Sequence, residues 1–147
     1  MDETQIEYKS EFLPNITIVV VFKEDPLYPQ VNEYFDEYGY GFMVPGKDLV
    51  IIDGEILEEV DDTSIIKFIE AHEISHILLN HSGPRDEKEE LEADLGAYLL
   101  LSRNGYNNAI DLLLEHFEDR HGIKFSEDLL PEISKKLGLD TPKDWFF

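Results

Sequence analysis

Hydrophobic positions in the first third of the chain follow the short spacing of β-strands. A β-branched apolar run over residues 16–22 is bounded by prolines and predicts a buried strand. Two more strands are predicted over residues 40–44 and 49–53, and the Pro45-Gly46 pair between them favours a hairpin. A short helix is predicted over residues 31–38, after a loop.

After Gly54 the apolar positions change to helical spacing. The first long helix is predicted to begin at the capping residues 61–64 and to end before Gly83-Pro84, where the glycine and proline stop it. Three further helices are predicted over about 86–103, 108–120 and 130–137. Strands followed by helices predict a single α+β domain over residues 1–147, in which a small antiparallel or mixed sheet packs on a helical layer.

The charge of the chain is strongly acidic and narrows the choice of partners. Twelve Lys and Arg against 33 Asp and Glu give a net charge of −21. This balance argues against nucleic acid and anionic membranes as partners, because both require clustered basic groups, and it allows a basic protein partner. The chain has no cysteine and begins with polar, acidic residues, so we expect a cytoplasmic protein without disulfides. Its oligomeric state is not indicated.

The first long helix contains an HExxH motif formed by His72, Glu73 and His76. Side chains four residues apart lie one helical turn apart on one face, so both imidazoles can reach one metal ion. Glu73 is offset by about 100° around the helix and can act on a metal-bound water as a general base. Two histidines hydrogen-bonded in an ordinary core are the alternative interpretation.

A third ligand is expected on the next helix, since a catalytic zinc ion usually has three protein ligands. The chain turns back after His81, which brings Glu90 to nearly the height of His76 along the paired helices. Glu90 is therefore the predicted ligand, Glu89 the alternative if the register is shifted, and Glu92 should face away. Asp94, one turn beyond Glu90, is placed to accept a hydrogen bond from a ligand imidazole.

These two segments resemble the gluzincin zinc metallopeptidases. His72-Glu73-Ile74-Ser75-His76 and Glu90-Leu91-Glu92-Ala93-Asp94 are most similar to the compact minigluzincins and ImmA/IrrE-type peptidases, in which HExxH-x-L-L-x-H and Glu-x-Glu-Ala-Asp/Asn runs recur. The resemblance covers about residues 48–101. It implies a zinc-dependent endopeptidase that cleaves protein substrates, with Glu73 as general base. Leu79 and Ser82 stand where metzincins have Gly and His, which excludes that class.

Other parts of the mechanism stay open in the sequence. An oxyanion needs a hydrogen-bond donor, and the sequence does not rank the candidates Tyr40, Tyr98, Arg103, Tyr106 and His116. The resemblance implies an edge strand that pairs with the substrate. Residues 49–52 resemble it, although a core strand is an equally good interpretation. His81 is expected to be a residue of the helix C-terminus rather than a fourth ligand.

Two further features have competing interpretations. The acidity indicates either a solvated surface or attraction to a basic substrate, such as a DNA-binding repressor by analogy with ImmA/IrrE-type peptidases. The C-terminal Trp145-Phe146-Phe147 segment indicates either satellite core or an inhibitory tail.

The main alternative function is a catalytically silent, acidic zinc-fold binding module with a regulatory or anti-repressor-like role. A nucleotide-handling enzyme has little support because no Gly-rich phosphate loop is present. Glu73 distinguishes the endopeptidase from the binding module, since hydrolysis requires a base and binding does not.

Overall fold

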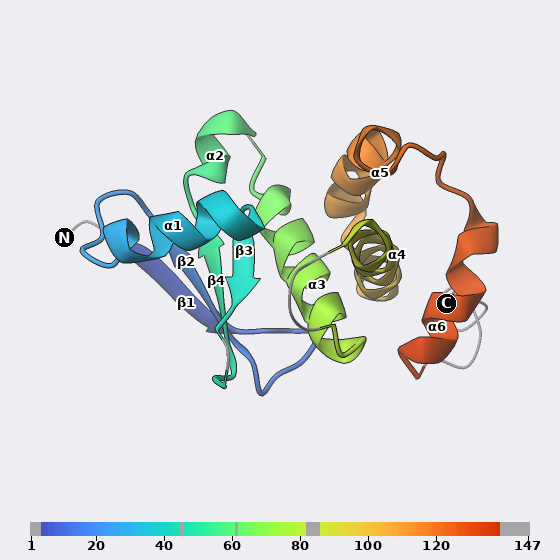
Figure 1. Cartoon of the computed structure of the whole chain (residues 1–147), viewed down its shortest axis with the longest axis horizontal. Coiled ribbons are helices and arrows are strands. Elements are labelled where there is room, and N and C mark those ends of the chain that lie inside the picture. The colour runs from blue at the N-terminus through green and yellow to red at the C-terminus, as the bar shows by residue number, and fades with distance from the viewer. Residues whose placement is uncertain (1–3, 45, 61, 82–85, 139–147) are drawn as a thin grey trace.

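A four-stranded sheet forms one side of the molecule, and most of the helices form the other (Figure 1). The computed structural model describes residues 4–44, 46–60, 62–81 and 86–138, and the Trp145-Phe146-Phe147 segment lies outside them. The predicted α+β class is confirmed. The strands are β1 (Gln5–Lys9), β2 (Thr17–Val21), β3 (Gly41–Met43) and β4 (Leu49–Asp53).

The sheet is mixed and has the strand order β1-β2-β4-β3. β2 and β4 run parallel, whereas β1 pairs with β2 and β3 pairs with β4 in the antiparallel sense. The hairpin predicted around Pro45-Gly46 is therefore confirmed as β3–β4. β4 lies between β2 and β3, which shows that residues 49–52 form a core strand and not an edge strand. The edge on this side of the sheet is β3.

Helices cover both faces of the sheet. The helices are α1 (Tyr28–Tyr38), α2 (Ile56–Glu59), α3 (Ser64–Leu78), α4 (Glu87–Arg103), α5 (Asn107–His121), the 3₁₀ turn η1 (Glu127–Leu129) and α6 (Leu130–Lys136). α3 lies on one face and α1 on the other, while α4 packs against α3, α5 and α6 (Figure 1).

The central strands alternate between two cores because side chains along a strand point to opposite faces in turn. Ile18 and Val20 of β2 pack in the core under α3, whereas Val19 and Val21 pack under α1. A strand buried on both faces has a nearly continuous apolar sequence. This is why residues 16–22 could be identified as a buried strand.

Two elements were missed by the sequence prediction, and two helix boundaries differ from it. β1 was missed because its sequence, QIEYK, is mostly polar and exposed, as suits an edge strand. The single-turn α2 was also missed. α1 begins at Tyr28 rather than at residue 31, with Pro29 in its first turn, where proline is tolerated. α3 ends at Leu78, before the predicted Gly83-Pro84 stop, and Asn80 then adopts a left-handed conformation with φ of 60°.

α3 and α4 approach each other closely at Gly96. A Cβ atom on Gly96 would lie 2.7 Å from Oγ and 2.9 Å from Cβ of Ser75, so only glycine fits without a shift of the helices. Ala93 and Ala97, two further small residues of α4, are fully buried. This contact fixes the separation of the two helices that carry the predicted metal ligands.

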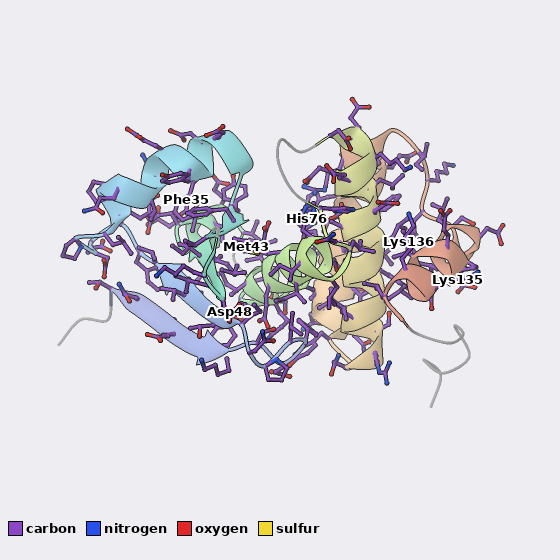
Figure 2. The ribbon with its side chains drawn as sticks, turned by 60° about the horizontal axis from the view of Figure 1, so that its bottom comes forward. Phe35, Met43, Asp48, His76, Lys135 and Lys136 are labelled. Atoms are coloured by element: carbon purple, nitrogen blue, oxygen red, sulfur yellow. The ribbon has the colours of Figure 1, made fainter. Side chains whose placement is uncertain are left out.

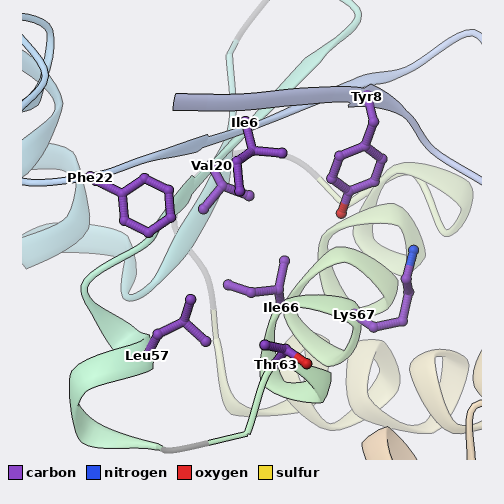
Figure 3. A pocket seen from close by; sticks show the side chains of 8 residues that line it. All are labelled: Ile6, Tyr8, Val20, Phe22, Leu57, Thr63, Ile66 and Lys67. Carbon is purple, nitrogen blue, oxygen red and sulfur yellow. The ribbon is translucent and has the colours of Figure 1, made fainter. Parts of the chain in front are cut away.

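An apolar pocket of about 400 Å³ lies between α3 and the β1–β2 side of the sheet (Figure 3). Its walls come from two strands, α2, α3 and the turn before α3: Ile6, Tyr8, Val20, Phe22, Leu57, Thr63, Ile66 and Lys67. It therefore lies against a different face of α3 from the HExxH side chains. Among the described residues, no helix combines the length and the apolar character that crossing a membrane requires.

Candidate metal centre

Three predicted ligands converge between α3 and α4. His72 and His76 project from one face of α3, with their Nε2 atoms 3.1 Å apart. Glu90 of α4 places its Oε2 atom 3.2 Å from His72 Nε2 and its Oε1 atom 3.0 Å from His76 Nε2. Both imidazoles are buried, whereas Glu90 is partly exposed.

The spacing of these atoms suits a small divalent cation. Ligand atoms placed tetrahedrally at the usual distance from zinc lie about 3.3–3.4 Å from one another, and the three observed separations are 3.0–3.2 Å. Two imidazoles and one carboxylate are also a donor set found in catalytic zinc sites. The residues that the structure describes therefore fit a zinc ion, with the ligands that the sequence predicted and not the alternative Glu89.

His72 is held from behind by Asp94. The Nδ1 atom of His72 lies 2.7 Å from Oδ1 of Asp94, which is fully buried. Asp94 is the residue that the sequence placed behind a ligand imidazole. It also accepts hydrogen bonds from Arg120 Nε at 2.9 Å and His121 Nε2 at 2.5 Å, both at the end of α5. Sequence analysis missed these two residues, because nothing in the pattern of α5 shows that its last turn contacts α4.

His76 has a different partner, His81. The two Nδ1 atoms are 2.8 Å apart, and His81 Nε2 lies 3.0 Å from Glu92 Oε1. Glu92 does point away from the ligand atoms, as expected, but it contacts His81 and accepts a hydrogen bond from Lys136 of α6 at 2.7 Å. His81 lies three residues beyond the last residue of α3, so it does not belong to the helix C-terminus as predicted. Its contact with His76 was not predicted, although the third histidine of the HExxH-x-L-L-x-H run signals it.

The charges within the group are strongly coupled. Burial lowers the pKa of His72, but hydrogen bonds to Asp94 and Glu90 outweigh this effect and raise the pKa to about 9. Burial raises the pKa of Glu90, yet hydrogen bonds from both histidines hold it far below its ordinary value. His72 donates its Nδ1 hydrogen to a carboxylate and, when neutral, aims the Nε2 lone pair at Glu90. Lone pairs from three directions thus meet at a point that favours a cation.

An open pocket of about 500 Å³ adjoins this group. His72, Glu73 and Glu90 line its inner end, and Glu73 itself is 2% exposed. The remaining walls come from the edge of β3, α2, α3 and α5: Gly39, Tyr40, Gly41, Ile56, Glu59, Val60, Ile65, Phe68, Ile69, His116, Asp119 and Arg120. A Cβ atom on Gly41 would lie 2.8 Å from Ile69 Cγ2 and 3.3 Å from Glu73 Cγ, so β3 runs directly beside Glu73.

Two of the five candidate oxyanion donors line this pocket, Tyr40 and His116. The Tyr40 hydroxyl donates to Glu59 at 2.5 Å, and this hydrogen bond, together with burial, raises its pKa to about 12. Its hydrogen is therefore already engaged, which leaves His116. Tyr106 donates to Glu11 and Tyr98 stacks on Phe125, and neither they nor Arg103 line this pocket.

The fold and this group of side chains define an α+β protein with a candidate metal centre beside an open pocket. The chain matches the model of peptidase family M48 over residues 13–88, which is 76 of its 147 residues. The chain therefore belongs to peptidase family M48, a family of metal-dependent peptidases. No curated protein and no solved structure matches it. The matched region includes the HExxH helix but ends before Glu90.

Proposed function

We propose that the protein is a zinc-dependent endopeptidase of the gluzincin type that hydrolyses peptide bonds in protein substrates. The observation that carries this proposal is that the Nε2 atoms of His72 and His76 lie 3.1 Å apart and each lies within 3.2 Å of a carboxylate oxygen of Glu90, beside an open pocket. Membership of family M48 supports peptidase activity. The region that matches the family ends at residue 88, so it gives no support for Glu90 as a ligand.

The residues have separate chemical roles in this proposal. A bound zinc ion supplies Lewis-acid chemistry, because it lowers the pKa of water toward about 7 and polarises a carbonyl group. Glu73, which lines the pocket beside His72, accepts a proton from the attacking water and returns it to the leaving amine. His116 donates a hydrogen bond to the developing oxyanion from the α5 wall.

The free edge of β3 provides a place for an extended substrate. Val44 N–H donates to Leu49 and Asp53 N–H donates to Tyr40, so hydrogen bonding with β4 alternates through residues 40, 42 and 44. The backbone groups of Gly41 and Met43 consequently face away from β4. A substrate strand that pairs with them runs past Glu73 and can place a scissile bond in the pocket.

The charge of the chain bears on the choice of substrate. The net charge of −21 favours a basic protein or peptide as substrate, and a repressor-like substrate follows only by analogy with the ImmA/IrrE-type peptidases. We propose no nucleic-acid or membrane partner, and we propose a cytoplasmic location.

The test uses three matched substitutions. Glu73→Gln should retain one zinc ion per chain and lose about 10²–10⁴-fold in the rate at which labelled casein is cleaved, because only the proton acceptor is removed. Glu90→Gln should lose bound zinc. Glu89→Gln changes the neighbouring glutamate in the same way and should leave zinc content and turnover unchanged.

Metal analysis and casein cleavage on the same samples decide the outcome. Normal turnover in Glu73→Gln would reject Glu73 as the base. Zinc binding without cleavage in the wild type would favour the catalytically silent binding module.

A further inference from the structure

A chain of polar contacts runs from His76 across α4 to the C-terminal helix. His76 Nδ1 lies 2.8 Å from His81 Nδ1, His81 Nε2 lies 3.0 Å from Glu92 Oε1, and Glu92 Oε2 lies 2.7 Å from Lys136 Nζ. The side chains of His81 and Glu92 are only 10% and 13% exposed. The first three groups are thus shielded from water, whereas Lys136 is 41% exposed and closes the chain at the surface.

The hydrogen atoms in this chain are fixed by its acidic end. Glu92 is an acceptor, because Lys136 Nζ, which can only donate, lies 2.7 Å from its Oε2 atom and pairs with an ionised carboxylate. His81 Nε2 must therefore carry a hydrogen, and the Nδ1 atom of a neutral His81 has a lone pair. His76 then donates its Nδ1 hydrogen to that lone pair. The Nε2 lone pair of His76 is left facing His72 and Glu90, which is the tautomer that binds a metal ion.

The two ligand imidazoles are therefore held in two different ways. His72 donates directly to the buried carboxylate of Asp94. On its Nδ1 side His76 contacts the imidazole of His81, which in turn contacts the carboxylate of Glu92. A carboxylate behind a ligand histidine fixes the orientation of the ring and raises its basicity, and removal of such a partner weakens metal binding.

We infer that His81 and Glu92 are positioning residues for the metal ligand His76, and that Lys136 anchors Glu92 so that the docking of α6 contributes to metal affinity. This inference rests on the proposed zinc site. It assigns a specific role to the third histidine of the HExxH-x-L-L-x-H run and to a helix about 60 residues further along the chain.

Two substitutions at His81 separate its two hydrogen bonds. The Oδ1 atom of asparagine is as many bonds from Cα as the Nδ1 atom of histidine, so His81→Asn keeps an acceptor for His76 and loses the contact with Glu92. The amide of glutamine reaches as far as the Nε2 atom, so His81→Gln keeps a donor for Glu92 and loses the acceptor. His81→Phe removes both hydrogen bonds and retains a ring of similar shape.

The affinity for zinc should follow the acceptor at His81. Competition with a chromophoric chelator measures the zinc Kd, and the absorption spectrum of the Co²⁺-loaded protein reports the ligand geometry. His81→Phe and His81→Gln should bind zinc about 10–100-fold more weakly than the wild type. His81→Asn should lose only about 2–10-fold in zinc affinity, because it loses the hydrogen bond to Glu92 but keeps the acceptor for His76. It should also keep the wild-type Co²⁺ spectrum.

The contribution of α6 to metal affinity can be tested with two neighbouring lysines, Lys136 and Lys135. Figure 2 shows Lys136 nearer to α4 than Lys135, and Lys136 donates to Glu92. Lys136→Met should weaken zinc binding about twofold to fivefold, since it removes a partly exposed ion pair. Lys135→Met changes the charge of the same helix equally and should leave the zinc Kd unchanged.

Equal zinc affinities in the wild type, His81→Asn and His81→Gln would overturn the inference while leaving the zinc site intact. Equal losses in His81→Asn and His81→Gln would also overturn it, because they would show a packing role that does not depend on the acceptor. Circular dichroism of the metal-free variants provides the folding control. If the wild type itself binds no zinc, the proposed function fails, and this inference fails with it.

Discussion

Replacement of Gly96 by alanine tests whether helix separation controls the metal centre. Gly96 lies on α4, six residues after Glu90, and faces Ser75 of the HExxH motif on α3. The change adds a single methyl group at a buried contact and alters no charge and no ligand. Any effect on metal binding must therefore be transmitted by the distance between α3 and α4.

The size of the effect follows from the contact distances. The new methyl group would lie 2.9 Å from Ser75 Cβ, whereas carbon atoms pack at about 3.5–4.0 Å, so the helices must separate by about 0.6 Å. Ser75 Oγ cannot turn away freely, because it donates to Ala71 O at 2.8 Å. Overpacking of this kind costs about 1–3 kcal/mol, and the better helix propensity of alanine returns about 1 kcal/mol.

We expect the free energy of unfolding of metal-free Gly96→Ala to fall by about 1 kcal/mol in urea titrations. The zinc Kd should rise about tenfold or more, because ligands need to stay within about 0.5 Å of their places. Ser75→Gly is the matched control. It should lower stability by about 0.5 kcal/mol through helix propensity without a change in the zinc Kd.

The double variant Ser75→Gly/Gly96→Ala removes both atoms of Ser75 that meet the new methyl group, and it should recover most of the zinc affinity. An unchanged zinc Kd in Gly96→Ala would refute the reasoning, because the ligand group would then tolerate the separation. Loss of affinity that the double variant does not restore would point to a different cause.

Two further predictions concern the substrate. Met43→Pro removes one N–H from the free edge of β3 and leaves the hydrogen bonds to β4 in place. Met43→Pro should lower kcat/KM on labelled casein about 2–10-fold, whereas Met43→Ala should leave it unchanged. Equal kcat/KM values in the two variants would argue against substrate pairing at β3. If the acidic surface attracts substrate, the rate at which a lysine-rich quenched peptide is cleaved should fall as salt rises from about 50 to 500 mM. The Debye length falls from about 14 to 4 Å over this range. The cleavage rate of a neutral peptide of equal length should not change.

Much of the candidate site could be predicted because it depends on local geometry. The helical repeat alone places His72 and His76 on one face of α3, and a short connection to an antiparallel helix brings Glu90 to their height. The buried strand β2 and the β3–β4 hairpin were predictable for the same reason, since side-chain alternation and a turn signal act over a few residues.

The parts that escaped prediction depend on contacts between distant segments. Arg120 and His121 lie at the end of α5, and only the packing of α5 on α4 brings them to Asp94. Lys136 reaches Glu92 across 44 residues. The strand order is of the same kind, because the sequence does not show that β4 would pair with β2 as well as β3 and leave β3 at the edge.

These distant partners support the candidate metal centre from behind both of its histidines. Each predicted ligand histidine on α3 is held by a carboxylate of α4, directly at Asp94 or through His81 at Glu92. Each carboxylate is in turn held by a cationic side chain of a later helix, Arg120 of α5 or Lys136 of α6. α4 thus supplies one ligand and both supporting carboxylates, and its distance from α3 is set at a glycine. The separation of these two helices should therefore limit metal affinity more than any single exposed contact of the chain.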